Sequence, residues 1–199
     1  ARIQSLDCMG DGVAVYALGC HNLKVLNLSA SARSADSEHQ VQLVSCFGYL
    51  LRDAAIHGGN LSALVLLGSR GDIQNAYVAN SGAIDRKFSS ASRSHSIYMN
   101  GCFASRLRQV TASFGILAVD CHGDWDLVDC SVLDGGAILF PDTSDAGTLR
   151  VVRGEFNADA LAEGASSATR QPRTAAALWA VPETLVVGEC GWQYVDVDG

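Results

Sequence analysis

The 199-residue chain is predicted to fold as an all-β, right-handed parallel β-helix, a solenoid of about six to seven coils with one-sided loop insertions. Three observations support this prediction. A six-residue apolar template returns six times, and each copy follows a second short apolar segment that ends in a turn. The shorter repeats, near 20 to 22 residues, leave no room for two strands and a crossover helix.

The template has apolar residues at positions one and four in every copy. Position six is also apolar, except in the last copy, where Gly154 occupies it. The copies are Leu23–Leu28, Leu51–Ile56, Ile73–Val78, Leu107–Ala112, Leu127–Val132 and Leu149–Gly154. A unit that cannot bury its apolar face alone must stack on its neighbours. We therefore expect the first positions to form one interior column, namely Leu23, Leu51, Ile73, Leu107, Leu127 and Leu149.

The second apolar segment of each unit has its own regular ending. A Cys or Ser follows it at the turn in five of the six units, as expected of small residues that stack in the narrow corner of a coil. The segments are Val13–Leu18, Val41–Val44, Leu64–Leu67, Ile97–Met99, Ile116–Val119 and Ala137–Phe140. An antiparallel sandwich is the main alternative, since it also has evenly spaced short strands. The positional identity of successive units favours the solenoid.

The repeat divides the chain into three parts. We expect the β-helix over residues 1–156, a loop or extension over 157–183, and a C-terminal hairpin or cap over 184–199. Three insertions follow a hexamer at the same point: Ser29–Gln40, Ala79–His95 and Asn157–Glu183. They should therefore leave the solenoid on one side. Because the pattern starts at Ile3 with no covering helix, we expect a fragment or a first coil covered by another subunit.

Composition excludes several classes of function. The net charge of -7 and only 14 scattered basic residues argue against a nucleic-acid partner. No apolar run approaches the roughly 20 residues that span a bilayer, so we expect no membrane span. The seven cysteines show neither a CxxC pair nor a zinc-site spacing, which favours free thiols and assembly in a reducing cytosol. No motif points to a cofactor or a metal ion.

This repeat resembles the right-handed parallel β-helix of the pectin-lyase-like superfamily, which includes polysaccharide lyases, glycoside hydrolases and bacteriophage tail spikes. The resemblance covers about residues 3–156 and lies in architecture and repeat length. No catalytic signature of a particular member is matched, so no residue role is transferred.

Acidic residues gather near the fifth repeat, at Asp120, Asp124, Asp126, Asp129 and Asp134. Asp124 and Asp126 are two residues apart, so on a strand they share a face. A glycosidase needs two such carboxylates, and we take Asp124 and Asp126 as the candidate catalytic residues. A calcium site and a plain acidic turn are the alternatives.

Basic residues recur at or beside position two of the template, at Arg52, Arg106, Arg108 and Arg150. Stacked outward arginines could face an anionic chain, although Gln74 and Val128 interrupt the series. Ordinary surface charge is the simpler interpretation.

The insertions supply the candidate binding residues, because loops on one side of a solenoid commonly form its binding face. These residues are Arg33, Glu38, His39, Asp85, Arg86, Arg93 and His95. Solvated loops without a function are the alternative.

Together these features lead us to expect a virion-type or surface spike or decoration protein whose loops bind a glycan or a protein. The alternative is a polysaccharide lyase or glycoside hydrolase acting on a surface polysaccharide, and the sequence leaves catalysis open. We expect a repetitive surface partner and a homo-oligomer, with a trimer as one arrangement. Localisation is left open between a virion and an extracellular surface. A purely architectural rod is the third option.

Overall fold

The computed structural model describes residues 1–34, 37, 39–59, 61–80, 95–113, 115–119, 121–133, 137–139, 146–153, 155–156, 178–180 and 184–188. All regular structure in these ranges is β-strand, in agreement with the predicted all-β class. Within them, no helix exists that is long and apolar enough to cross a membrane.

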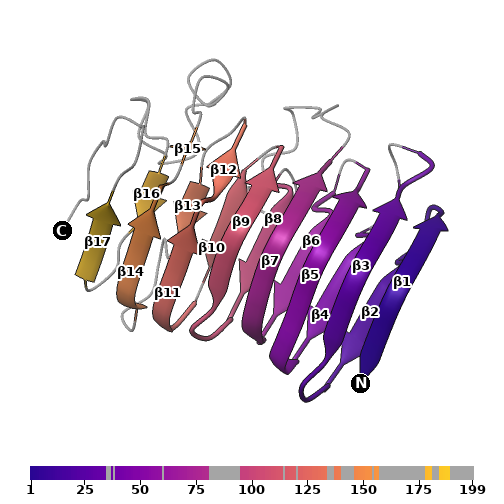
Figure 1. Ribbon diagram of the computed structural model, residues 1–199, viewed down its shortest axis with the longest axis horizontal. Coiled ribbons are helices and arrows are strands. Elements are labelled where there is room, and N and C mark those ends of the chain that lie inside the picture. The colour runs from indigo at the N-terminus through magenta and orange to yellow at the C-terminus, as the bar shows by residue number, and fades with distance from the viewer. Residues whose placement is uncertain are drawn as a thin grey trace.

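The first sheet contains ten strands, all paired in parallel. Its main path is β1-β3-β5-β7-β9-β11-β14-β17, and the short β12 and β15 continue it beside β9 (Figure 1). The bounds are β1 Arg2–Met9, β3 Lys24–Ser31, β5 Phe47–His57, β7 Arg70–Ala79, β9 Arg106–Ala112, β11 Gly123–Val128, β12 Ser131–Val132, β14 Ala146–Val152, β15 Glu155–Phe156 and β17 Thr184–Gly188.

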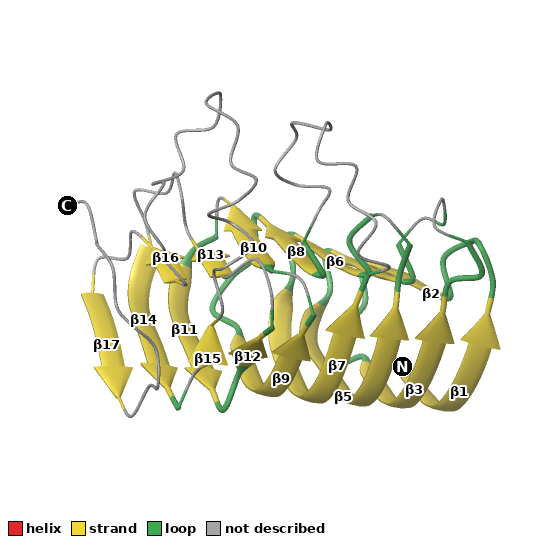
Figure 2. Cartoon of the chain, turned by 90° about the horizontal axis from the view of Figure 1, so that it is seen from above, coloured by secondary structure: helices red, strands yellow, loops and turns green. Residues whose placement is uncertain are grey.

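The second sheet has seven parallel strands in the order β16-β13-β10-β8-β6-β4-β2. Their bounds are β2 Val15–Leu18, β4 Val41–Val44, β6 Leu64–Leu67, β8 Ile97–Asn100, β10 Ile116–Val119, β13 Ala137–Leu139 and β16 Leu178–Ala180. The chain alternates between the two sheets, and each strand lies beside its counterpart one unit earlier (Figure 2). This parallel solenoid has about five turns, slightly fewer than the six to seven predicted.

A column of residues in the left-handed backbone conformation bends the first sheet along the solenoid axis. Seven successive passes of the chain through the first sheet each contribute one residue with φ between 47° and 56°, and the flanking pairs place these residues opposite one another. They are Ser5, Asn27, Asp53, Asn75, Gln109, Asp129 and Arg153. Asn and Asp adopt this conformation more readily than other non-glycine residues, and the Asn75 amide donates to Asp53 Oδ1 at 2.8 Å. The bend resets the in–out alternation, which explains why template positions one and four both face inward.

The interior column differs from the prediction at its two ends. In the structure Val25, Leu51, Ile73, Leu107, Leu127 and Val151 are in register. The predicted column is thus correct for its four middle members and wrong for Leu23 and Leu149, which lie two residues earlier along the strand. Because two residues is a full period of a strand, Leu23 still faces the core and is buried.

The corner after the second sheet is filled by small residues, as predicted. Cys46, Ser69, Cys102 and Cys121 are buried there on successive coils, with the half-buried Cys20 before them. Ser69 Oγ accepts from the Cys46 N–H at 3.0 Å and donates to Leu67 O at 2.9 Å. The six cysteines that the structure describes are free thiols.

The three insertions all connect the first sheet to the second. They lie between Ser31 and Val41, between Ala79 and Ile97, and between Phe156 and Leu178, which places them at one corner of the coil. Strand β16 falls inside the segment expected to be a loop or extension, and β17 pairs with β14 in parallel. The rest of the expected C-terminal hairpin, residues 189–199, lies outside the described residues.

Candidate functional site

A groove with a volume of about 700 Å³ lies on the outer face of the first sheet. It spans β5, β7, β9, β11 and β14, so its length follows the solenoid axis. Gly48 and Ala104 are among its smaller lining residues. Six charged residues line it: Arg70, Asp72, Arg106, Asp124, Asp126 and Arg150. The groove therefore presents both signs of charge to anything that lies along it.

Four of these charges form one cross-strand column. Asp72 pairs with Arg106, Arg106 with Asp126, and Asp126 with Arg150, so the sign alternates from coil to coil. Arg106 Nε lies 3.7 Å from Asp126 Oδ2, and both side chains are partly in solvent. An exposed ion pair of this kind contributes only about 0–1 kcal/mol. The column thus adds little to stability while keeping charged groups at the surface.

The candidate catalytic residues Asp124 and Asp126 both line the groove. They lie on β11, where Asp124 is exposed and Asp126 half-buried. Asp72 is a third carboxylate of the groove that sequence reasoning missed. It lies two coils from Asp126 in the same column, a backbone separation of about 9.6 Å at the usual strand spacing. Its alignment with Asp126 appears only once the register across the intervening 34-residue repeat is known.

The predicted arginine series is split between two columns. Arg106 and Arg150 line the groove, whereas Arg52 and Arg108 do not, although they flank the groove residue Gln74 in the next column. Arg52 Nε is 3.3 Å from Asp53 Oδ2. Arg70, which the hexamer template does not include, is the third arginine of the groove.

An aromatic column lies beside the groove, and the sequence analysis did not anticipate it. We use this name for His21, Phe47, Phe103 and His122. His21 bridges to Phe47 and Phe103 to His122 in parallel, while Arg70 pairs with Phe47. Ring centroids are 5.9 Å apart for His21 and Phe47, 6.3 Å for Phe47 and Phe103, and 5.7 Å for Phe103 and His122. Both phenyl rings are exposed, Phe47 by 38% and Phe103 by 42%.

Three of the candidate binding residues of the insertions, Arg33, His39 and His95, lie among the described residues. Arg33 is exposed. The half-buried His39 has Nδ1 2.7 Å from Ser62 O. His95 is only 4% exposed and packs so closely on Gly115 that an added Cβ there would lie 2.5 Å from its Cδ2. Glu38, Asp85, Arg86 and Arg93 lie outside the described residues.

No set of three His, Cys, Asp or Glu side chains suitable for a metal ion occurs within the described ranges.

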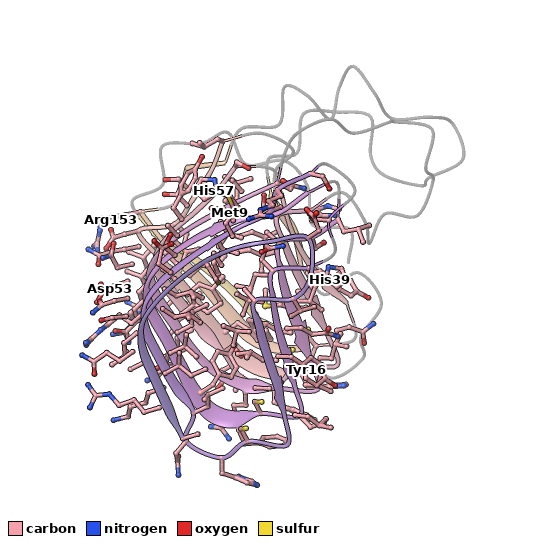
Figure 3. All side chains as sticks on the ribbon, turned by 90° about the vertical axis from the view of Figure 1, so that its right-hand side faces the viewer. Met9, Tyr16, His39, Asp53, His57 and Arg153 are labelled. Carbon is pink, nitrogen blue, oxygen red and sulfur yellow. The ribbon has the colours of Figure 1, made fainter. Side chains whose placement is uncertain are left out.

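The Asp129 carboxyl, on the bend rather than in the groove, has its pKa held below the ordinary range by Arg153. Asp53 and Arg153 project from the same edge of the coil, well away from Tyr16 on the second sheet (Figure 3).

Fold and site together define a parallel β-solenoid with a mixed-charge groove and an aromatic column on one outer face. Comparisons with protein-family models, curated proteins and solved structures found no match. The structure therefore shows a parallel β-solenoid, and the resemblance to pectin-lyase-like and tail-spike proteins stays a prediction.

Proposed function

We propose that this protein is a surface spike or decoration protein whose rigid solenoid binds an extended glycan in the groove. The observation that carries the proposal is the direction of the groove, which crosses five successive strands of the first sheet. From β7 to β14 each coil places one charged side chain about 4.8 Å further along the axis, and the sign of the charge alternates. A repeating array of this kind fits a repeating polymer better than a compact ligand.

The lining chemistry suits a hydroxylated chain. Guanidinium groups of Arg70, Arg106 and Arg150 are donors only, and the carboxylates of Asp72 and Asp126 are acceptors. A sugar chain presents both donors and acceptors, so it can pair with both kinds of group. The insertions, which carry the other candidate binding residues, would contact a glycan or a protein partner.

A glycan array followed by calorimetry on the full chain tests the proposal. We expect at least one polysaccharide class to bind, and Asp72→Asn and Arg150→Gln each to weaken binding about tenfold, the effect of losing about 1.4 kcal/mol. Arg52→Gln is the matched control, because Arg52 lies on the same sheet outside the groove. A chain that binds no glycan, or a control that loses as much affinity as the groove variants, would refute the proposal.

A second candidate function is glycan cleavage, as a lyase or a glycoside hydrolase. It is favoured by the presence of Asp124 and Asp126 in the same groove. Incubation with a panel of polysaccharides, followed by assays for new reducing ends and unsaturated products, separates the two. The binding proposal predicts no release. Release that is abolished in Asp124→Asn or Asp126→Asn would make the protein an enzyme.

Assembly as a homo-oligomer, with a trimer as one arrangement, is part of the proposal. The exposed Met9, Tyr16 and Leu18 support it, since large apolar side chains in contact with water favour association. Light scattering should give a mass that is a multiple of 20.9 kDa. A monomer at micromolar concentration would remove this part and leave the groove unaffected.

A further inference from the structure

We infer that the aromatic column is a stacking subsite for the glycan, on which the apolar C–H faces of pyranose rings lie. This inference rests on the proposed function and names the surface that gives it specificity. The rings of Phe47 and Phe103 would carry the contact, and Arg70 would bind an acceptor oxygen of the stacked sugar.

Backbone hydrogen bonds show that the column is continuous through Arg70. The Arg70 N–H donates to Cys46 O, and the Phe103 N–H donates to Ser69 O, both at 2.9 Å. The two hydrogen bonds follow the same parallel pattern, so the Arg70 backbone lies between those of Phe47 and Phe103. The groups that the subsite needs therefore lie on three consecutive coils.

The phenyl rings lean toward each other across the Arg70 position. Two coil steps separate their backbones by about 9.6 Å, yet the ring centroids are 6.3 Å apart with an interplanar angle of 35°. The two exposed rings therefore lie close enough together to contact one ligand.

Arg70 complements the rings with a polar group. It lines the groove and takes part in none of the ion pairs between described residues. A guanidinium in this position can donate to hydroxyl or carboxylate oxygens at the rim of a stacked sugar. The aromatic column and the groove thus meet at Arg70 and can hold one chain together.

The alternative is that the aromatic column serves only to stabilise the stack of coils. A purely structural role requires apolar contact between the side chains but not the flat face of a phenyl ring. Phe47→Leu and Phe103→Leu keep an apolar side chain and remove the ring, so they separate the two roles. Tyr77→Ala is the matched control: Tyr77 is 38% exposed, and its ring centroid lies 5.4 Å from that of His57 with the rings tilted by 48°, on the same sheet beyond the bend.

The experiment is calorimetry of the full chain with cellohexaose, chitohexaose and the hexamer of α-1,4-linked galacturonic acid. We expect at least one to bind, each Phe→Leu variant to weaken it by up to about tenfold, and the double variant by more, since aromatic stacking contributes about 0.5–1.5 kcal/mol. Arg70→Gln should weaken an acidic probe more than a neutral one. Tyr77→Ala should bind like the wild type.

The outcomes separate this inference from the proposed function. Binding that falls with Arg150→Gln but is unchanged in the double Phe→Leu variant would overturn the stacking subsite and leave the groove in place. Wild-type protein that binds none of the three probes would overturn the subsite. If the glycan array also showed no binding, the proposed function would fail with it. Circular dichroism of each variant confirms that it is folded.

Discussion

At the scale of single residues, the bend in each coil depends on one residue with a positive φ. At Asn27, Asp53, Asn75 and Asp129 the residue type tolerates positive φ, but at Gln109 (φ 54°) and Arg153 (φ 50°) it does not. An ordinary side chain in this region costs about 1–2 kcal/mol relative to glycine. The fold therefore accepts some strain at these two positions to keep the bend in register.

Gln109→Gly should consequently raise the free energy of unfolding, or leave it unchanged where the added freedom of the unfolded chain offsets the gain. Gln109→Val should lower it by about 1–2 kcal/mol, since β-branched residues fit this region worst. Urea denaturation of both variants gives the comparison. Equal losses in the two variants would mean that φ is not what limits this position.

The bend also explains why the sequence pattern predicts the apolar positions of a coil but not the register of every repeat. The apolar residues at template positions one, four and six are predicted correctly. The distances between these positions, three residues and then two, do not reveal which residue has a positive φ. Alignment on the polar residue at position three would have given Asn27 and Arg153, and with them Val25 and Val151 in place of Leu23 and Leu149. Asp72, Arg70 and the aromatic column depend on register across repeats of unequal length, which a single sequence does not determine.

Gly71 marks a position where two neighbouring coils approach closely. A Cβ on Gly71 would lie 2.3 Å from Tyr49 O and 2.5 Å from Tyr49 Cγ. Gly71→Ala should therefore destabilise the fold by about 1–3 kcal/mol through overpacking. Gly12→Ala, which meets nothing within 4 Å, is the control. Thermal melts of the two variants should differ, and identical melts would contradict the close packing.

At the scale of elements, the end of β11 and the end of β14 are joined by an exposed ion pair. Arg153 donates to Asp129 through Nη2 at 3.0 Å and also through Nε, and this interaction lowers the pKa of the Asp129 carboxyl. A carboxyl whose folded pKa is depressed contributes stability above its ordinary pKa, and this contribution is lost as pH falls through the folded value.

Arg153→Gln should accordingly raise the pKa of Asp129 toward the ordinary range for aspartate. Carboxyl carbon shifts followed by NMR during an acid titration measure this directly. Any stability difference between wild type and variant should be present at neutral pH and should disappear at a pH below the folded pKa. An Asp129 titration that is the same in both proteins would show that the ion pair does not persist in solution.

At the scale of the whole molecule, each coil contacts only the coils beside it, so stability is a sum of neighbouring contacts. Among the described strands, charged residues occur on the first sheet alone. The described strands of the second sheet contain no Asp, Glu, Lys or Arg, whereas those of the first sheet contribute the groove. A change in one coil should therefore act locally, and the groove can vary without altering the stack beneath it.

Ile73→Ala tests this locality. Ile73 is fully buried in the interior column between Leu51 and Leu107, and its truncation should cost about 2–5 kcal/mol. Hydrogen exchange should then accelerate most in β5, β7 and β9, and much less in β1. Arg108→Ala, at an exposed position of β9, should change no exchange rate appreciably. Equal acceleration in all strands after Ile73→Ala would mean that the solenoid unfolds as one cooperative unit, which would contradict the nearest-neighbour description.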